Sequence, residues 1–275
     1  MNGPIPPARP EARVPEYAFG DSPVAAERLS LLAQTYAASS RSFLRASVDF
    51  RPELAADLGC GPGHSTHLLA NALKPAQTIG FDNSESFLAQ ALTTGTESVR
   101  FELHDITAAP FPRGPFDLMY GRFVLTHLRD PKSIIETWVG QLRPGGTLLI
   151  EEVEFIDSRI DEFVLYLGIQ QSMLANQANA LYVGPRLGMM TGIMNARLKA
   201  SNVTGLVVPA PRAASMFQMN LASIRERKFV RDNYNASIID ELYRGLLAIA
   251  GCESQGSTYP AVKWGLRQIS LERSP

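Results

Sequence analysis

Apolar residues near the start of the chain recur at the spacing of an α-helix. Between residues 22 and 47, one side of such a helix carries Leu29, Leu32, Tyr36, Phe43 and Leu44. Ser22 followed by Pro23 is a typical helix start, because serine can cap the unpaired N–H groups and proline fits the first turn. The pattern predicts one helix over residues 22–47, with a break near residues 38–40.

After residue 52 short apolar runs alternate with helical stretches. Such runs are typical of the buried strands of a parallel sheet. We expect strands at residues 54–58, 78–81, 99–103, 116–120 and 147–152, with helices between them at 65–73, 84–92 and 132–142. This alternation predicts an α/β fold with an open, doubly wound sheet and right-handed connections. Ligands of such sheets bind at the carboxyl ends of the strands.

The second half of the chain departs from this alternation. Residues 160–182 are expected to form an inserted helix whose apolar side chains line a pocket or simply pack. Met189, Met190 and Met194 are interpreted either as an adaptable apolar wall or as plain core. A sixth strand is expected near residues 203–208, helices over 215–250 and a seventh strand over 259–269.

The composition of the chain disfavours several classes of partner and location. The chain has 275 residues, and its 26 basic residues nearly cancel 27 acidic ones, so neither nucleic acid nor an anionic membrane is favoured as a partner. Only two cysteines occur, and no apolar run approaches the roughly 20 residues of a membrane span, so a cytoplasmic location is expected. Residues 1–15 contain five prolines and are expected to be flexible.

The candidate chemistry begins at DLGCGPGHS, residues 57–65, directly after the first expected strand. Gly59, Gly61 and Gly63 allow the backbone to approach a ligand without side-chain clashes. The following helix, with Ser65 or Thr66 as its expected cap, offers its N–H groups to an anionic group. These features predict a ligand site on the loop.

Acidic residues follow the next two expected strands. Asp82 is placed to accept hydrogen bonds from both hydroxyls of a ribose, and Asp105 lies beside the same cleft. A glycine turn or an acid after a strand is, alone, more often a packing or capping feature. Their succession at three strand ends favours a nucleoside cofactor. A nicotinamide dehydrogenase normally has G-x-G-x-x-G, and here the third glycine comes one position early.

The segments DLGCGPG, FDNS, HDI, FDLMYGRFVLTHLRDP and LRPGGTLLIEE, in this order, resemble the motifs of the class I S-adenosylmethionine-dependent methyltransferases. The resemblance covers residues 54–155 and extends more weakly to both ends of the chain. It implies a seven-stranded Rossmann-like sheet with an antiparallel last strand, an N-terminal helix over the cofactor and an inserted helical lid. Cap helices are then expected over residues 16–50 and the methyltransferase domain over 51–275, with the helical insertion at about 156–200.

The resemblance also implies which positions bind S-adenosylmethionine. The glycine loop is expected to face the methionine part, the acid after the second strand the ribose, and the residues after the third strand the adenine. The expected cofactor-binding residues are Tyr17, Arg28, Asp57, Gly59, Gly61, Gly63, Asp82, Asn83, Asp105, Ile106, Gly121, Arg122 and Phe123.

Methyl transfer from a sulfonium is an in-line displacement that needs the acceptor atom about 3 to 3.5 Å from the methyl carbon. A base helps when the acceptor is a hydroxyl or a protonated amine. His127 is the candidate catalytic base, with local packing as its alternative role. His64 and His67 lack a cysteine or carboxylate to complete a ligand set, so no metal site is expected.

The sequence therefore predicts an S-adenosylmethionine-dependent methyltransferase with a small-molecule acceptor. A bacterial secondary metabolite, or another apolar intermediate, methylated at oxygen, nitrogen or carbon is the expected acceptor. A non-catalytic S-adenosylmethionine-binding protein and a dinucleotide-dependent oxidoreductase remain the alternatives. The oligomeric state stays open, with a homodimer as one option.

Overall fold

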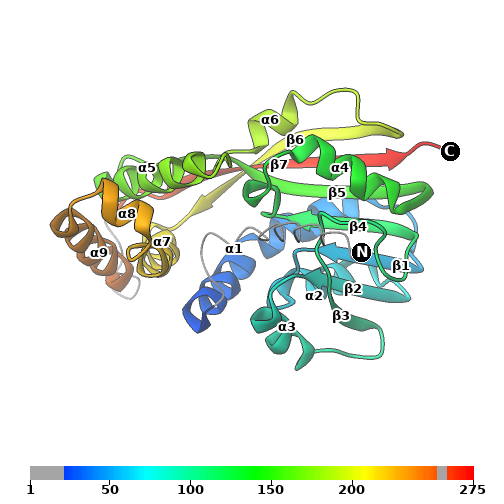
Figure 1. Ribbon diagram of the computed structural model, residues 1–275, viewed down its shortest axis with the longest axis horizontal. Coiled ribbons are helices and arrows are strands. Elements are labelled where there is room, and N and C mark those ends of the chain that lie inside the picture. Colours follow the sequence, from blue (N-terminus) through cyan, green and yellow to red (C-terminus); the bar gives the residue numbers. More distant parts are fainter. Residues whose placement is uncertain (1–21, 253–258) are drawn as a thin grey trace, which may run out of the picture.

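Residues 22–252 and 259–275 are described by a computed structural model, and within them one sheet of seven strands organises the chain (Figure 1). The strands are β1 (Leu54–Leu58), β2 (Gln77–Asp82), β3 (Val99–Leu103), β4 (Phe116–Arg122), β5 (Leu142–Asp157), β6 (Ala196–Val208) and β7 (Val262–Arg273). Their order in the sheet is β3-β2-β1-β4-β5-β7-β6. The expectations for residues 1–15 and for Tyr17 lie outside the described residues.

The sheet is parallel from β3 to β5, and β7 runs antiparallel to both β5 and β6. The strand order reverses between β1 and β4, so the loops after these two strands diverge and leave room for a ligand at their carboxyl ends. The expected α/β fold class and the antiparallel last strand are confirmed. The sixth strand begins at Ala196, well before the expected residue 203.

Helices flank the sheet and extend beyond it. They are α1 (Pro23–Ser47), α2 (His64–Leu73), α3 (Glu85–Leu92), the short 3-10 helix η1 (Leu125–His127), α4 (Pro131–Gly140), α5 (Asp161–Asn176), α6 (Gly184–Gly188), α7 (Ala210–Ile224), α8 (Lys228–Asn233) and α9 (Ala236–Gly251).

Helix α1 is continuous, so the break expected near residues 38–40 is wrong. Its start is the expected one, with the Ser22 hydroxyl accepting the Ala25 N–H. At the expected break, Ser40 is fully buried and its hydroxyl accepts a hydrogen bond from Arg122 at 3.0 Å. Tyr36 and Leu44 are buried on the same helix, one turn before and after Ser40. Tertiary contacts therefore stabilise the helix across Ser39 and Ser40, which are weaker helix formers than the alanines before them.

The capping expected for α2 is also wrong. Its N-cap is Gly63 in the left-handed region at φ +92°, and no side chain caps the helix. The hydroxyls of Ser65 and Thr66 instead donate to Asp57 Oδ2, at 2.7 and 2.6 Å. Asp57 is fully buried at the end of β1 and needs donors there, so the two hydroxyls tie the helix to the strand.

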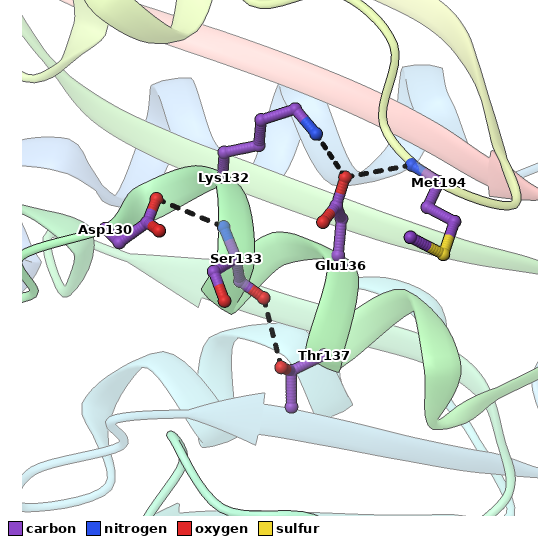
Figure 2. Close-up of polar contacts among 6 residues, drawn as sticks. All are labelled: Asp130, Lys132, Ser133, Glu136, Thr137 and Met194. Atoms are coloured by element: carbon purple, nitrogen blue, oxygen red, sulfur yellow. Dashed lines mark hydrogen bonds and ion pairs between the residues drawn. The ribbon is translucent and has the colours of Figure 1, made fainter.

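An aspartate side chain caps the start of helix α4 (Figure 2). Asp130 Oδ1 accepts the Ser133 N–H at 3.3 Å, and Pro131 occupies the first turn. One turn further, Glu136 accepts hydrogen bonds from the Lys132 side chain and from the backbone N–H of Met194, the latter at 3.2 Å. The carboxylate thus ties the loop before β6 to α4.

The methionine cluster forms neither a pocket wall nor a shared core. Met189 and Met194 are 75% and 64% exposed, while Met190 is partly buried against the core below α4. The loop held by Glu136 runs over the outer surface, so two of the three thioethers face solvent.

The two faces of the sheet carry separate cores, as the alternation of side chains along a strand requires. On one face, Ala55, Leu118 and Leu149 pack with residues of α1 and α2. On the other face, their neighbours Ala56, Met119 and Leu148 pack with residues of α4. Both faces are therefore covered by helices, which explains the continuous apolar runs in the sequence.

A third core lies among α5, α7, α8 and α9, which gather at one end of the molecule (Figure 1, left). The long strands β5 and β7 extend from the sheet toward these helices. Tyr36 of α1 and Trp264 of β7 belong to the same cluster, so it is continuous with the rest of the molecule. Residues 156–200, the expected insertion, contain α5 and α6 together with the end of β5 and the start of β6.

Candidate active site

A cavity of about 740 Å³ lies between the carboxyl ends of β1–β4 and the helices at the end of the molecule. This size suits a small-molecule ligand. One half of the lining comes from the loops after β1–β4, and we call it the strand-end half. The other half comes from α1, from α5 and the residues after it, from α7, from Arg227 just before α8, and from the strands β5 and β7, and we call it the helical half. The two halves differ in chemistry.

The glycine loop forms part of the strand-end half. Gly59 and Gly61 have left-handed φ values of +68° and +51°, and a Cβ on Gly59 would lie 2.8 Å from a Val124 methyl carbon. The Gly61 N–H donates to Asp82 Oδ2 at 2.7 Å, while Asp82 Oδ1 accepts the Ser84 N–H at 2.9 Å. Asp82 thereby connects the glycine loop to the start of α3 and fixes the shape of this edge.

Not every residue predicted to bind the cofactor reaches the cavity. Asp57 is fully buried behind the loop, where burial raises its pKa to about 6. Gly63 does not line the cavity either, and a Cβ there would meet the Phe101 ring at 2.8 Å. Gly121 lies against Trp138 and Val124. None of these three residues lines the cavity, because each is enclosed by the sheet and its helices, and their direct contact with the cofactor stays a prediction.

The acids and apolar residues after β2 and β3 lie where the sequence predicts. Asp82, Asn83, Asp105 and Ile106 all line the cavity. Asp105 Oδ1 accepts both the N–H and the hydroxyl of Thr107, and the Ile106 carbonyl accepts the Trp138 indole N–H at 2.8 Å. These hydrogen bonds therefore fix the backbone of the residues that follow β3.

The end of β4 brings Arg122 and Phe123 to the boundary between the two halves. Arg122 donates to Ser40 of α1, and Phe123 holds a left-handed φ of +59°, which is rare for a bulky residue. The Phe123 N–H donates to the Glu151 carbonyl, and its ring meets the Tyr36 ring edge-on at 5.0 Å. Strain of this kind gathers at ligand sites. Arg28 of α1 is buried and also lines the cavity.

His127 lines the cavity, but its environment opposes the role of general base. Burial, and next the positive charge of Arg28, lower the pKa of its imidazole to about 3. At neutral pH the ring is neutral, and adding a proton there costs about 5 kcal/mol. A catalytic base works best with a pKa near the working pH. The electrostatics therefore argue against the predicted catalytic role of His127.

Glu152 on β5 is a residue that sequence reasoning missed. It is fully buried, and its Oε1 accepts the N–H groups of Val124 and Leu125 at 2.8 and 2.7 Å. Its Oε2 accepts the Thr126 hydroxyl at 3.1 Å. Burial raises the pKa of this carboxyl to about 7 despite these donors. Glu152 thus holds the segment that carries His127. The sequence feature that could have revealed it is the pair of acids, Glu151 and Glu152, inside an apolar strand.

The polar residues of the helical half were missed as well. Tyr166 and Gln170 on α5 and Asn220 on α7 are buried and line the cavity. Phe217 and Trp264 line it beside them, with ring centroids 5.8 Å apart. A glutamine and an asparagine on otherwise apolar helix faces were the available signal, since buried polar side chains need a partner.

Comparison with known proteins places the core of the chain in a family. Residues 56–150 match the family described as "Methyltransferase domain". Trans-aconitate 2-methyltransferase of Variovorax paradoxus strain S110 is 46% identical over 103 residues, which are 36% of this chain and 39% of the relative. An uncharacterized 37.1 kDa protein in transposon TN4556 of Streptomyces fradiae is 32% identical over 229 residues, 76% of this chain and 66% of that protein. The first of these relatives is thus matched over about two fifths of its length.

A solved structure shares the fold over most of the chain. Coclaurine N-methyltransferase bound to N-methylheliamine and SAH is 14% identical, with a TM-score of 0.52, and the match covers 90% of this chain and 72% of that one. At this identity the likeness concerns the fold alone.

The open sheet and the glycine loop at its switch point define a Rossmann-like α/β protein. Within that class, the chain contains a class I S-adenosylmethionine-dependent methyltransferase domain. The family resemblance of the motifs in residues 54–155 is thereby confirmed.

Proposed function

We propose that the protein is an S-adenosylmethionine-dependent methyltransferase whose acceptor is a small organic molecule, such as a secondary metabolite. The observation that carries the proposal is the division of one cavity into two unlike halves. The strand-end half has the loop and acids that suit a nucleoside, and the helical half provides space that a nucleoside cofactor alone does not require.

The residues of the strand-end half suit the adenosyl part of the cofactor. A carboxylate can accept up to about four hydrogen bonds, so Asp82 can accept ribose hydroxyls in addition to the Gly61 and Ser84 N–H groups. Because Gly61 already donates to Asp82, the loop needs little rearrangement when a ligand binds. Asn83, Asp105 and Ile106 remain the proposed adenine contacts.

The residues at the boundary suit the methionine part. S-adenosylmethionine supplies an electrophilic methyl group on a positively charged sulfur. The rings of Tyr36, Phe123 and Trp264 line the cavity there, with Tyr36 5.0 Å from Phe123 and 5.6 Å from Trp264. Aromatic faces attract a cation while excluding water. These rings provide an apolar wall that excludes water from the sulfonium, whose charge disappears during the reaction.

The alternatives from the sequence are less well supported. The match to the methyltransferase domain and the early third glycine both speak against a dinucleotide oxidoreductase. The helical half speaks against a cofactor-binding protein without an acceptor. Relatives named trans-aconitate 2-methyltransferase support a small-molecule acceptor in this family. Among the described residues, no helix is long and apolar enough to cross a membrane. The cytoplasmic location stays a prediction, and the oligomeric state stays open.

Calorimetry tests the proposal. S-adenosylhomocysteine is expected to bind and NADH is not. Asp82→Ala should weaken S-adenosylhomocysteine binding by about tenfold or more, because charge-assisted hydrogen bonds are lost. Asp117→Ala is a matched control, since Asp117 accepts the Glu53 and Leu54 N–H groups at the other end of β1, away from the cavity. Equal affinities in the two variants would contradict the ribose assignment.

A further inference from the structure

The helical half of the cavity holds a polar cluster, formed by Tyr166, Gln170 and Asn220, that the cofactor site does not use. The Tyr166 hydroxyl accepts the Asn220 side-chain N–H at 2.8 Å and also the Gln170 side-chain N–H. Its ring stacks on Phe217, with centroids 4.4 Å apart and planes 25° from parallel. The hydroxyl is therefore held in one place by two helices.

The Tyr166 hydroxyl can still donate one hydrogen bond. A phenol oxygen accepts two hydrogen bonds and donates one. Both accepting positions of Tyr166 are used, and among the described residues no oxygen or nitrogen accepts its proton. Burial raises the pKa of the hydroxyl, so it stays protonated. Tyr166 thus presents a fixed O–H donor in the cavity, strengthened by the two amides that donate to it.

The charge of the helical half points to the kind of group that receives this donor. Among the described residues after 150 that line the cavity, none is acidic and Arg227 is basic. Arg28 lines the cavity from α1, and its positive charge lowers the pKa of both Tyr166 and His127, so its field acts on this half. A donor in a positive field favours an anionic oxygen group and disfavours an ammonium group.

Among the residues that the structure describes, the helical half also has no group that could deprotonate an acceptor. His127 has a pKa of about 3, and the Glu152 carboxylate faces the backbone of residues 124–126 without lining the cavity. An acceptor that is already deprotonated at neutral pH needs no such base. A carboxylate meets this condition, whereas an alcohol does not.

We propose that the helical half binds an organic acid with an apolar or aromatic body, and that its carboxylate oxygen receives the methyl group. This inference rests on the proposed methyltransferase function. A lone pair of the carboxylate oxygen forms the new bond to the methyl carbon, the bond from that carbon to sulfur breaks, and its electron pair stays on sulfur. No proton moves, and the products are a methyl ester and a neutral thioether. Tyr166 is the residue that orients the acid.

Binding to the protein loaded with S-adenosylhomocysteine tests the inference without relying on turnover. The probes are cinnamate and its neutral isostere cinnamamide, titrated calorimetrically. Cinnamate is expected to bind at least about tenfold more tightly, because the charged oxygen accepts the Tyr166 O–H in the field of Arg28. Equal binding of acid and amide, or no binding of cinnamate, overturns the inference.

A variant that lacks only the Tyr166 hydroxyl tests the role of this donor. Tyr166→Phe keeps the ring on Phe217 and removes the donor, so cinnamate should bind about tenfold more weakly while S-adenosylhomocysteine binds as before. Tyr243→Phe is the matched control, since that hydroxyl also accepts a side-chain amide, from Gln218, but does not line the cavity. The same loss in both variants overturns the role of Tyr166.

Two further measurements distinguish failure of this inference from failure of the proposed function. The ratio of acid to amide binding in the unaltered protein tests the charge preference even if Tyr166→Phe unfolds, which a thermal melt detects. Failure of S-adenosylhomocysteine to bind removes the proposed function itself. Intact S-adenosylhomocysteine binding with no preference for the acid removes only this inference. Mass spectrometry on a panel of aromatic and unsaturated acids, with their amides as controls, should find methyl esters only.

Discussion

Replacing Glu152 by glutamine separates the charge of this buried side chain from its hydrogen bonds. Glutamine has nearly the same shape, and its carbonyl oxygen can accept the Val124 and Leu125 N–H groups that Glu152 Oε1 accepts now. Its amide N–H can donate to the Thr126 hydroxyl oxygen in place of Oε2. The segment lining the cavity should therefore keep its position while the ionisable group is lost.

The size of the effect follows from the pKa. Burial raises the pKa of Glu152 from 4.5 to about 7, so the folded protein holds this proton more tightly than the unfolded chain does. The contribution to stability is fully present below pH 4.5 and is lost as the pH rises through 7. A rise of this size corresponds to about 3 kcal/mol in total, of which roughly 2.5 kcal/mol falls between pH 5 and pH 8.

Urea unfolding of both proteins at pH 5 and pH 8 measures this. The free energy of unfolding of Glu152→Gln, relative to that of the unaltered protein, should improve by about 2 to 3 kcal/mol between the two pH values. Asp57, whose pKa burial raises to about 6, contributes in the same direction to both proteins and cancels in the comparison. Glu97→Gln, at an exposed position, controls for the loss of one carboxyl. Parallel pH dependences for Glu152→Gln and the unaltered protein would refute the reasoning.

Two other substitutions test the site and its scaffold. His127→Gln should lower turnover by less than the about 100-fold that loss of a general base costs, because an imidazole with a pKa of about 3 is a poor base; a larger fall without loss of cofactor affinity would restore the base role. Gly63→Ala should destabilise the protein by about 1 to 3 kcal/mol in thermal unfolding, because φ is +92° and the new Cβ would lie 2.8 Å from the Phe101 ring. Gly168→Ala, inside α5 with open space around its Cβ, should instead stabilise by up to about 1 kcal/mol, and similar melting shifts in both glycine variants would contradict this assignment.

The sequence was sufficient to locate polar residues that directly follow a parallel strand. Asp82 and Asp105 follow their strands directly, and parallel strands bring their carboxyl ends to one edge, so both line the cavity. Prediction failed where a neighbour in space decides the role. Asp57 precedes the glycine loop, as a ligand contact would, but the hydroxyls of Ser65 and Thr66 fold back over it.

The local pattern of the chain determined the elements, their order and the edge at which a cofactor binds, because spacing of apolar residues and turn chemistry act over a few positions. Only the tertiary structure decided the helical half of the cavity. Tyr166 and Asn220 are 54 positions apart, and Arg122 and Ser40 are 82 apart, yet each pair is joined by a hydrogen bond. The pKa values of His127 and Glu152 depend on everything that surrounds them, since burial is a property of the whole fold.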